Sequence, residues 1–209
     1  MSVESDGAVL VTLPRRAPAR AADEAVRELA PWIERRRRAL KRAAAEVART
    51  PGTVPYLGRE LLLVAQPGRT RVHRRGDVLL VPDDAAPAPS EPNSDRAAAL
   101  ERWYRRAARD EIGARLDAAV ARAGTAYTRL TIRGQRTRWA SCSAKGAMSF
   151  NWRLLLAPEP VLDYVVEHEV CHLEVMDHSP RFWRLLQARV PDWRAHSRWL
   201  RRYGSTLVL

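Results

Sequence analysis

The chain of 209 residues contains no run of about eighteen apolar residues, the length that a membrane-spanning helix requires. Its first residues, MSVESDGAVLVTLPRR, place acidic side chains ahead of a short apolar run. A secretory signal peptide has the opposite layout, with basic residues first and a longer apolar stretch after them. These two absences lead us to expect a cytoplasmic protein.

Cysteine is scarce, with Cys142 and Cys171 the only two in the chain. Two thiols cannot form a four-thiolate zinc site by themselves, and disulfides are rare in cytosolic proteins. We therefore expect two free thiols that are buried or half-buried.

Lysine is almost absent as well, since Lys41 and Lys145 are the only two, and arginine carries nearly all of the net charge of +12. Such a charge is typical of proteins that bind nucleic acid or another polyanion. The abundance of Ala and Arg also fits a biased genomic composition with a solvated basic surface. The most basic run, ERRRRALKR at 34–42, has no interleaved aromatic residues of the kind that stack on bases.

The pattern of the chain predicts two regions. Residues 1–94 form a β-rich lobe with one helix at 22–48 and three β-rich runs within 53–82, which we expect to pair as an antiparallel meander. This lobe ends in a Pro/Ala/Asp linker, PDDAAPAPSEPNSD.

We expect residues 95–209 to form the second region. Its periodicity predicts a helix that Gly124 ends, two strands separated by a loop, and three further helices. The expected ranges are 96–123 for the first helix, 127–133 and 148–156 for the strands, 134–147 for the loop, and 160–172, 180–190 and 192–204 for the later helices.

The most informative stretch is VEHEVCHLEVMDHS, which begins at Val166. His168 and His172 are four residues apart, so a helix places both imidazoles on one face, where they can reach a single ion. Glu169 lies about 100° round the helix from His168 and can lean over a water molecule at that ion. This is the H-E-x-x-H arrangement of zinc hydrolases, in which the glutamate is the general base.

A catalytic zinc usually has three protein ligands, so a third is needed. We expect His178, because Asp177, Ser179 and Pro180 favour a turn that returns the chain to the helix. Glu174 is the rival, but a continuing helix would direct it to the wrong side. Cys171 points away from His172 and is expected to pack. Hydrogen-bond partners of the rings should exist, and the acidic neighbours in sequence are Asp163, Glu167 and Asp177.

The same region resembles the YgjP-like zinc metallopeptidase family, which is related to the SprT and WLM zincins. The resemblance is carried by Arg138-Trp139-Ala140-Ser141-Cys142, Phe150-Asn151-Trp152-Arg153-Leu154, Tyr164 to His172, and Asp177-His178-Ser179 with Phe182-Trp183. The departures from the family pattern are Ala140 for Gly, Phe150 for Leu, Val170 for Leu and Asp177 for Asn. None of them replaces a proposed ligand or the proposed base.

The resemblance implies an α+β fold with a zincin-like core, in which a small twisted sheet packs against an active-site helix and a backing helix. It also implies a third histidine ligand. In zincins an edge strand aligns the substrate backbone, and we expect residues 147–152 to be that strand. Asn151, Arg153 and Arg138 are candidates for substrate binding, or for holding a loop in place, whereas Trp139, Trp152 and Trp183 are expected to be core packing.

The resulting hypothesis is a zinc metallopeptidase that cleaves peptide or protein substrates with a zinc-activated water and Glu169 as base. Two alternatives stay open. The same zinc chemistry could hydrolyse nucleotides such as nucleoside triphosphates, whose phosphates arginine binds well. The chain could also be a basic nucleic-acid-associated zinc protein without enzymatic activity.

Overall fold

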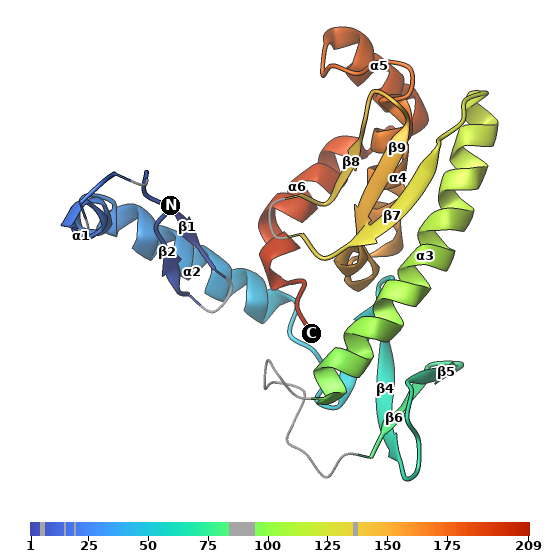
Figure 1. Cartoon of the computed structure of the whole chain (residues 1–209), viewed down its shortest axis with the longest axis horizontal. Coiled ribbons are helices and arrows are strands. Elements are labelled where there is room, and N and C mark those ends of the chain that lie inside the picture. Colours follow the sequence, from blue (N-terminus) through green and yellow to red (C-terminus); the bar gives the residue numbers. More distant parts are fainter. Residues whose placement is uncertain (5–6, 15, 19, 84–94, 136–137) are drawn as a thin grey trace. The chain divides into compact units, whose positions relative to one another are not determined.

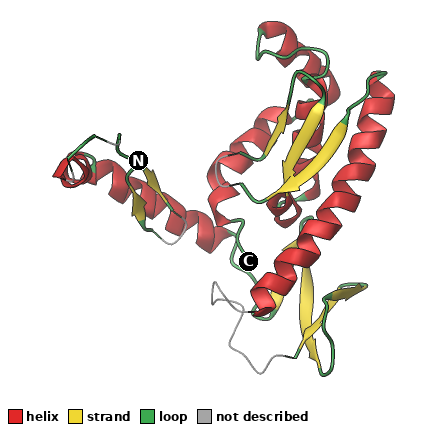
Figure 2. Cartoon of the chain, in the orientation of Figure 1, coloured by secondary structure: helices red, strands yellow, loops and turns green. Residues whose placement is uncertain are grey.

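The computed structural model describes residues 1–4, 7–14, 16–18, 20–83, 95–135 and 138–209 (Figures 1 and 2). The chain divides into two compact units, Met1–Ala48 with Arg201–Thr206 and Arg49–Leu200 with Leu207–Leu209. Most of the linker at 82–95 lies outside the described residues. The boundary between residues 94 and 95 stays a prediction.

The first unit contains two helices where the sequence predicts one at 22–48. They are α1 (Arg20–Glu28) and α2 (Ala30–Glu46), with Leu29 between them. Pro31 lies in the first turn of α2, because proline has no N–H and its ring would clash with a carbonyl in a helix interior. The unit also holds the antiparallel pair β1 (Ser2–Val3) and β2 (Val9–Leu10) and the 3-10 turn η2 (Gly204–Thr206).

The second unit begins with a four-stranded sheet in the order β3-β4-β6-β5. Its strands are β3 (Thr53–Tyr56), β4 (Arg59–Gln66), β5 (His73–Arg75) and β6 (Val78–Pro82). The prediction of an antiparallel meander is wrong for β4 and β6, which pair in parallel. The apolar β6, with Leu79 and Val81 fully buried, takes an inner position, and the charged β5 is left at the edge.

The second sheet of this unit has three strands in the order β7-β9-β8. They are β7 (Arg129–Arg133), β8 (Ala140–Cys142) and β9 (Ala147–Asn151). Strand β8 lies in the segment expected to be a loop. The predicted strand at 148–156 ends early, because the Asn151 side chain accepts a hydrogen bond from Arg153 N and starts the 3-10 helix η1 (Trp152–Leu156).

The strand expected at the sheet edge, residues 147–152, is β9, and it lies at the centre of the sheet. Strand β9 pairs in parallel with β7 and antiparallel with β8, so its main chain is occupied on both sides. Strand β8 is the edge strand instead. The prediction was wrong because a strand that follows a hairpin turn can lie inside a sheet once a third strand, here β7, adds to its other side.

Four helices confirm the helices expected in the core: α3 (Asp95–Ala123), α4 (Glu159–Cys171), α5 (Pro180–Arg189) and α6 (Trp193–Tyr203). The first three and most of α6 lie in the second unit, and α6 ends in Arg201–Tyr203 of the first. Gly124 ends α3 with a φ of 64°, a conformation that glycine adopts without steric cost. In Figure 1 the three-stranded sheet lies in front of α4, and α3 runs alongside β7. This is the expected α+β zincin-like core.

The described part of the chain contains no helix that is both long and apolar enough to cross a membrane.

Candidate metal centre

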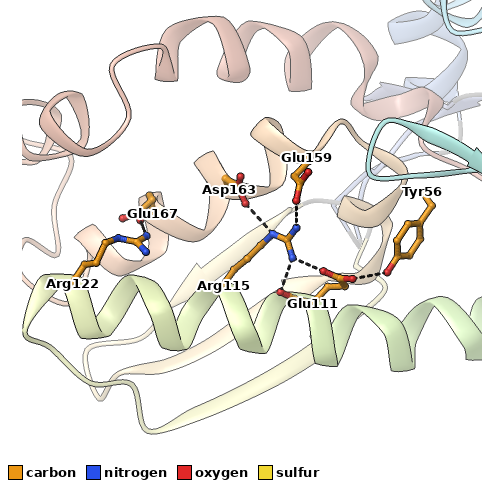
Figure 3. A network of polar contacts seen from close by, with 7 residues as sticks. All are labelled: Tyr56, Glu111, Arg115, Arg122, Glu159, Asp163 and Glu167. Carbon is orange, nitrogen blue, oxygen red and sulfur yellow. Dashed lines mark hydrogen bonds and ion pairs between the residues drawn. The ribbon is translucent and has the colours of Figure 1, made fainter. Parts of the chain in front are cut away.

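A network of charges attaches α4 to the long helix α3 (Figure 3). The guanidinium of Arg115 on α3 donates to Asp163, at 2.9 Å, and to Glu159, both on α4. It also bonds Glu111 on its own helix, and that carboxylate accepts the hydroxyl of Tyr56 at 2.9 Å. One arginine thus joins three carboxylates, so α4 is fixed along its first two turns.

A second ion pair holds the other end of α4. Arg122 lies 2.5 Å from Glu167, the residue that precedes His168. Asp163 and Glu167 therefore point toward α3, and the Asp177 carboxylate accepts from the backbone N–H of Ser179 at 3.4 Å. None of these three acidic residues bonds a histidine ring among the described contacts. For His172 the partner is a backbone carbonyl, that of Val175, 3.2 Å from Nδ1.

Three imidazoles converge at the end of α4. The ligand atoms of His168, His172 and His178 all lie within 4.8 Å of one another, and Nε2 of His168 is 3.1 Å from Nε2 of His178. Nitrogen ligands of a tetrahedral zinc, with bonds of about 2.0–2.1 Å, are separated by roughly 3.3 Å. The donor set, and the spacing of the His168–His178 pair, therefore fit a zinc ion.

Burial keeps the central ligand candidate in the form that binds metal. Burial of the His168 ring, together with the nearby His172 and His178, lowers the pKa of His168 to about 3. Burial also lowers the pKa of His172. A neutral imidazole offers a lone pair to a cation, whereas the protonated ring offers none.

The turn after α4 brings the third histidine to the other two. Helix α4 ends at Cys171, and Pro180 begins α5, so residues 172–179 are free to fold back. The rival residue Glu174 bonds Arg189 and is not part of the histidine group. Cys171 is buried and free, and its sulfur accepts from the same guanidinium at 3.5 Å, which agrees with a packing role.

Aromatic rings surround the triad. The fully buried ring of Phe182 is 4.6 to 4.9 Å from all three imidazoles, measured between ring centroids, and is stacked on His172. Trp183, expected as core packing, borders the core and also stacks on His178. Sequence reasoning missed these contacts. The sequence did carry a signal for them. Phe182 and Trp183 lie in the first turn of the helix that begins at Pro180, and side chains there can reach back to a residue just before the helix, such as His178.

Glu169 lies on α4 between His168 and His172 in the sequence and is buried, with 6% of its surface exposed. Burial raises the pKa of its carboxyl group to about 7, although the backbone N–H of Cys142 faces the group and lowers the pKa in part. Its Oε2 has no hydrogen-bond partner in the described structure. A carboxylate of this kind has one oxygen available to a water molecule. Cys142 on β8 was not predicted as a neighbour of Glu169.

The three residues proposed for substrate binding are placed differently from one another. Asn151 is buried, and its amide donates to the carbonyl of Gln135 at 2.6 Å, so it holds the loop that precedes β8. Arg153 lies over the ring of Trp152, 4.5 Å from its centroid. Arg138 is exposed, and its carbonyl accepts from Asn151 at 3.5 Å. The structure does not bring these side chains into the histidine group, and their contact with substrate stays a prediction.

The match to a protein family agrees with this arrangement. The family described as YgjP-like, metallopeptidase domain, matches residues 1–203. No curated protein matches the chain. Among solved structures, the crystal structure of the metallopeptidase zymogen of Pyrococcus abyssi abylysin is similar at 25% identity, over 46% of this chain and 94% of that one, with a TM-score of 0.40. Because the family match spans nearly the whole sequence, the chain belongs to the YgjP-like family of metallopeptidase domains.

Proposed function

We propose that the chain is a zinc-dependent peptidase. The observation that carries this proposal is the convergence of three imidazoles, His168, His172 and His178, beside the buried carboxylate of Glu169. A structural zinc site would be closed by a fourth protein ligand, commonly a cysteine. Among the described residues the histidine group has no fourth member, so a fourth position at the ion would be left for a water molecule or a substrate carbonyl.

Each residue then has a defined task. The three histidines bind zinc, which when present polarises the scissile carbonyl and makes water easier to deprotonate. Glu169 removes a proton from the attacking water as the water oxygen bonds to the carbonyl carbon. When the C–N bond breaks, Glu169 returns that proton to the leaving amine. The burial of Glu169 keeps bulk water from competing for the transfer.

The edge strand β8 is suited to align an extended substrate. Trp139 and Ser143 flank β8, and their main chains bond toward β9: Asn151 N donates to Trp139 O, and Ser143 N donates to Ala147 O. In an antiparallel ladder the residues between them, Ala140 and Cys142, face the other way. The N–H of Cys142 faces Glu169, so the free edge of β8 borders the proposed centre. A peptide that adds to this edge would lie along it.

The arginines favour peptides over nucleotides as substrates. Three arginines that contact residues of α4, namely Arg115, Arg122 and Arg189, are each paired with a carboxylate. A paired guanidinium is less available for a phosphate group, because that contact would first have to break an ion pair. We therefore propose peptide or protein substrates, with nucleoside triphosphates as the alternative to be tested.

The experiment compares wild type and Glu169→Gln on casein and on nucleoside triphosphates, with the zinc content of both proteins measured by elemental analysis. We expect one zinc per chain in both proteins, and casein cleavage that is at least about 100-fold slower in the variant than in the wild type. Phosphate release that requires Glu169, without casein cleavage, would establish the nucleotide alternative. A wild-type protein that binds no zinc would refute both readings.

A further inference from the structure

The geometry points to Trp183, supported by Trp193, as a positioning residue that fixes the ring of His178 and thereby sets the affinity of the centre for zinc. This inference rests on the proposed zinc site. It goes further by assigning a task to two tryptophans that are not ligands and do not touch the reacting atoms.

His178 is the ligand candidate that most needs support. His168 is on α4, and His172 directly follows that helix, is buried and is held by its contact with Val175. His178 is exposed and lies in the irregular segment between α4 and α5. An exposed side chain on irregular backbone has many conformations when no metal is bound. Restricting it to one conformation costs entropy, and this cost lowers the affinity for the metal.

Ring contacts supply the missing restraint. The imidazole of His178 is stacked on the indole of Trp183, with centroids 5.4 Å apart and planes at 26°. Trp183 is stacked in turn on Trp193, with centroids 4.6 Å apart and planes at 18°. The stack thus runs from the third ligand candidate through α5 to the first residue of α6.

The far end of this stack is anchored. The indole N–H of Trp193 donates to Oε1 of Gln187 at 3.0 Å, and a guanidinium N–H of Arg194 donates to the same oxygen at 2.7 Å. The amide of Gln187 donates to the carbonyl of Pro191 at 2.7 Å. Arg194 also lies over the Trp193 ring, 4.6 Å from its centroid. The corner between α5 and α6 therefore holds Trp193 from several sides.

Two readings of these tryptophans make different predictions. If they only fill space, their loss lowers stability and leaves the metal site unchanged. If they position His178, their loss weakens zinc binding more than stability explains. Trp193 separates the readings best, because in the described part of the chain it has no ring contact with any of the three histidines. Phe182 is less useful, since its full burial makes any substitution a core defect.

The test measures zinc affinity by chelator competition in wild type, Trp183→Leu, Trp193→Leu and Trp183→Phe. Trp103→Leu is the matched control, because this buried tryptophan on α3 contacts the rings of Tyr56 and Tyr104 instead. Cobalt is also bound to each protein, since its visible absorption spectrum reports the geometry of the ligands independently of activity. The melting temperature is recorded with and without zinc.

We expect Trp183→Leu and Trp193→Leu to bind zinc roughly three- to tenfold more weakly and to change the cobalt spectrum. Trp183→Phe, which keeps an aromatic ring, should recover most of the affinity. Trp103→Leu should lower the melting temperature of the metal-free protein while its zinc affinity stays at the wild-type value.

Several results would overturn the inference. Wild-type affinity in both leucine variants would do so, and so would an equal loss of affinity in Trp103→Leu. If Trp183→Leu does not fold, Trp193→Leu and the surface variant Arg194→Ala, expected to lose about twofold in affinity, decide the matter alone. A wild-type protein without zinc affinity refutes the proposed function as well. If the wild type and the variants all bind zinc equally tightly, only the role of the tryptophans is refuted.

Discussion

Nε2 of His168 and Nε2 of His178 lie 3.1 Å apart, although the two histidines are ten positions apart along the chain. Two ring nitrogens at this distance share either a proton or a cation. The nearby His172 and the buried Glu169 make a cation the better match, since together they supply a third donor and a base.

The first prediction concerns the third ligand. Replacing His178 with alanine should weaken zinc binding by more than about 100-fold, because even a hydrogen-bond partner of a ligand is worth 10- to 100-fold. The measurement is zinc per chain by elemental analysis after dialysis against a chelator. His73→Ala, at an exposed position on β5, is the control and should keep its zinc. One zinc retained in His178→Ala would remove this residue from the site.

The second prediction concerns the free edge of β8. In Ala140→Pro the N–H that faces away from β9 is lost, so the ladder between β8 and β9 keeps its bonds. We expect kcat/KM on casein to fall roughly tenfold or more, while the zinc content stays unchanged. This follows because an extended substrate would lose a main-chain partner. Unchanged kcat/KM in a folded variant would show that substrates do not pair with this edge.

The third prediction concerns the attachment of α4 to α3 (Figure 3). Arg115→Met should lower the free energy of unfolding by about 2–3 kcal/mol, because it leaves three carboxylates without their shared partner and the guanidinium is mostly buried, with 19% of its side chain exposed. Arg122→Met is the control, since that side chain is 66% exposed and its single ion pair should contribute less than about 1 kcal/mol. Urea denaturation measures both. Equal losses would contradict a special role of Arg115.

The fourth prediction is a pH dependence in the same network. Burial raises the pKa of Glu111, but hydrogen bonds from Arg115 and Tyr56 outweigh it, so the pKa lies below its usual 4.5. A lowered native pKa stabilises the protein above the unfolded-state value, and this stability is lost as the pH falls through the native value. The stability difference between wild type and Glu111→Gln, about 1 kcal/mol at pH 7, should therefore shrink toward pH 3.

Asp163 provides the opposite case for the same titration. Burial raises its pKa above the usual 3.8, although Arg115 lowers it in part. A raised native pKa of an acid means that protonation favours the folded state, so the wild type gains stability relative to Asp163→Asn as the pH falls through the raised value. As the pH falls, the stability difference between wild type and Glu111→Gln should therefore shrink, whereas wild type should gain stability relative to Asp163→Asn. Denaturation at several pH values measures both differences. If both change in the same direction, the assignment of the two pKa shifts is contradicted.

Local patterns account for the parts that the sequence predicted well. Gly124 ends α3 because glycine tolerates a positive φ, and Ser179 with Pro180 starts α5 because proline suits a first helical turn. The spacing of His168 and His172 brings the two rings together at the end of α4 for a local reason too, since they are one helical turn apart. Pro31, which divides the predicted N-terminal helix, is a local signal too, and it was overlooked.

Pairing between distant segments accounts for the errors. Two errors concern the order of strands: β4 and β6 pair in parallel, and β9 is central in its sheet. Both depend on contacts between strands that are distant in sequence, and no short stretch of sequence determines such contacts. Strand β8 is only three residues long and has little periodicity to detect. Its place beside Glu169 follows from the hairpin with β9.

The sequence by itself determined the family and the residues proposed for the chemistry: two histidines and a glutamate at helical spacing, a turn that returns a third histidine, and a motif set specific to one family. Residue type and spacing suffice there because a helix and a turn are local structures. Only the tertiary structure decided which strand lies at the edge, which side chains surround the histidines, and that Trp183 and Trp193 stack behind His178. Those contacts join residues whose distance in space is set by the packing of α4, α5 and α6, and packing is a property of the whole core.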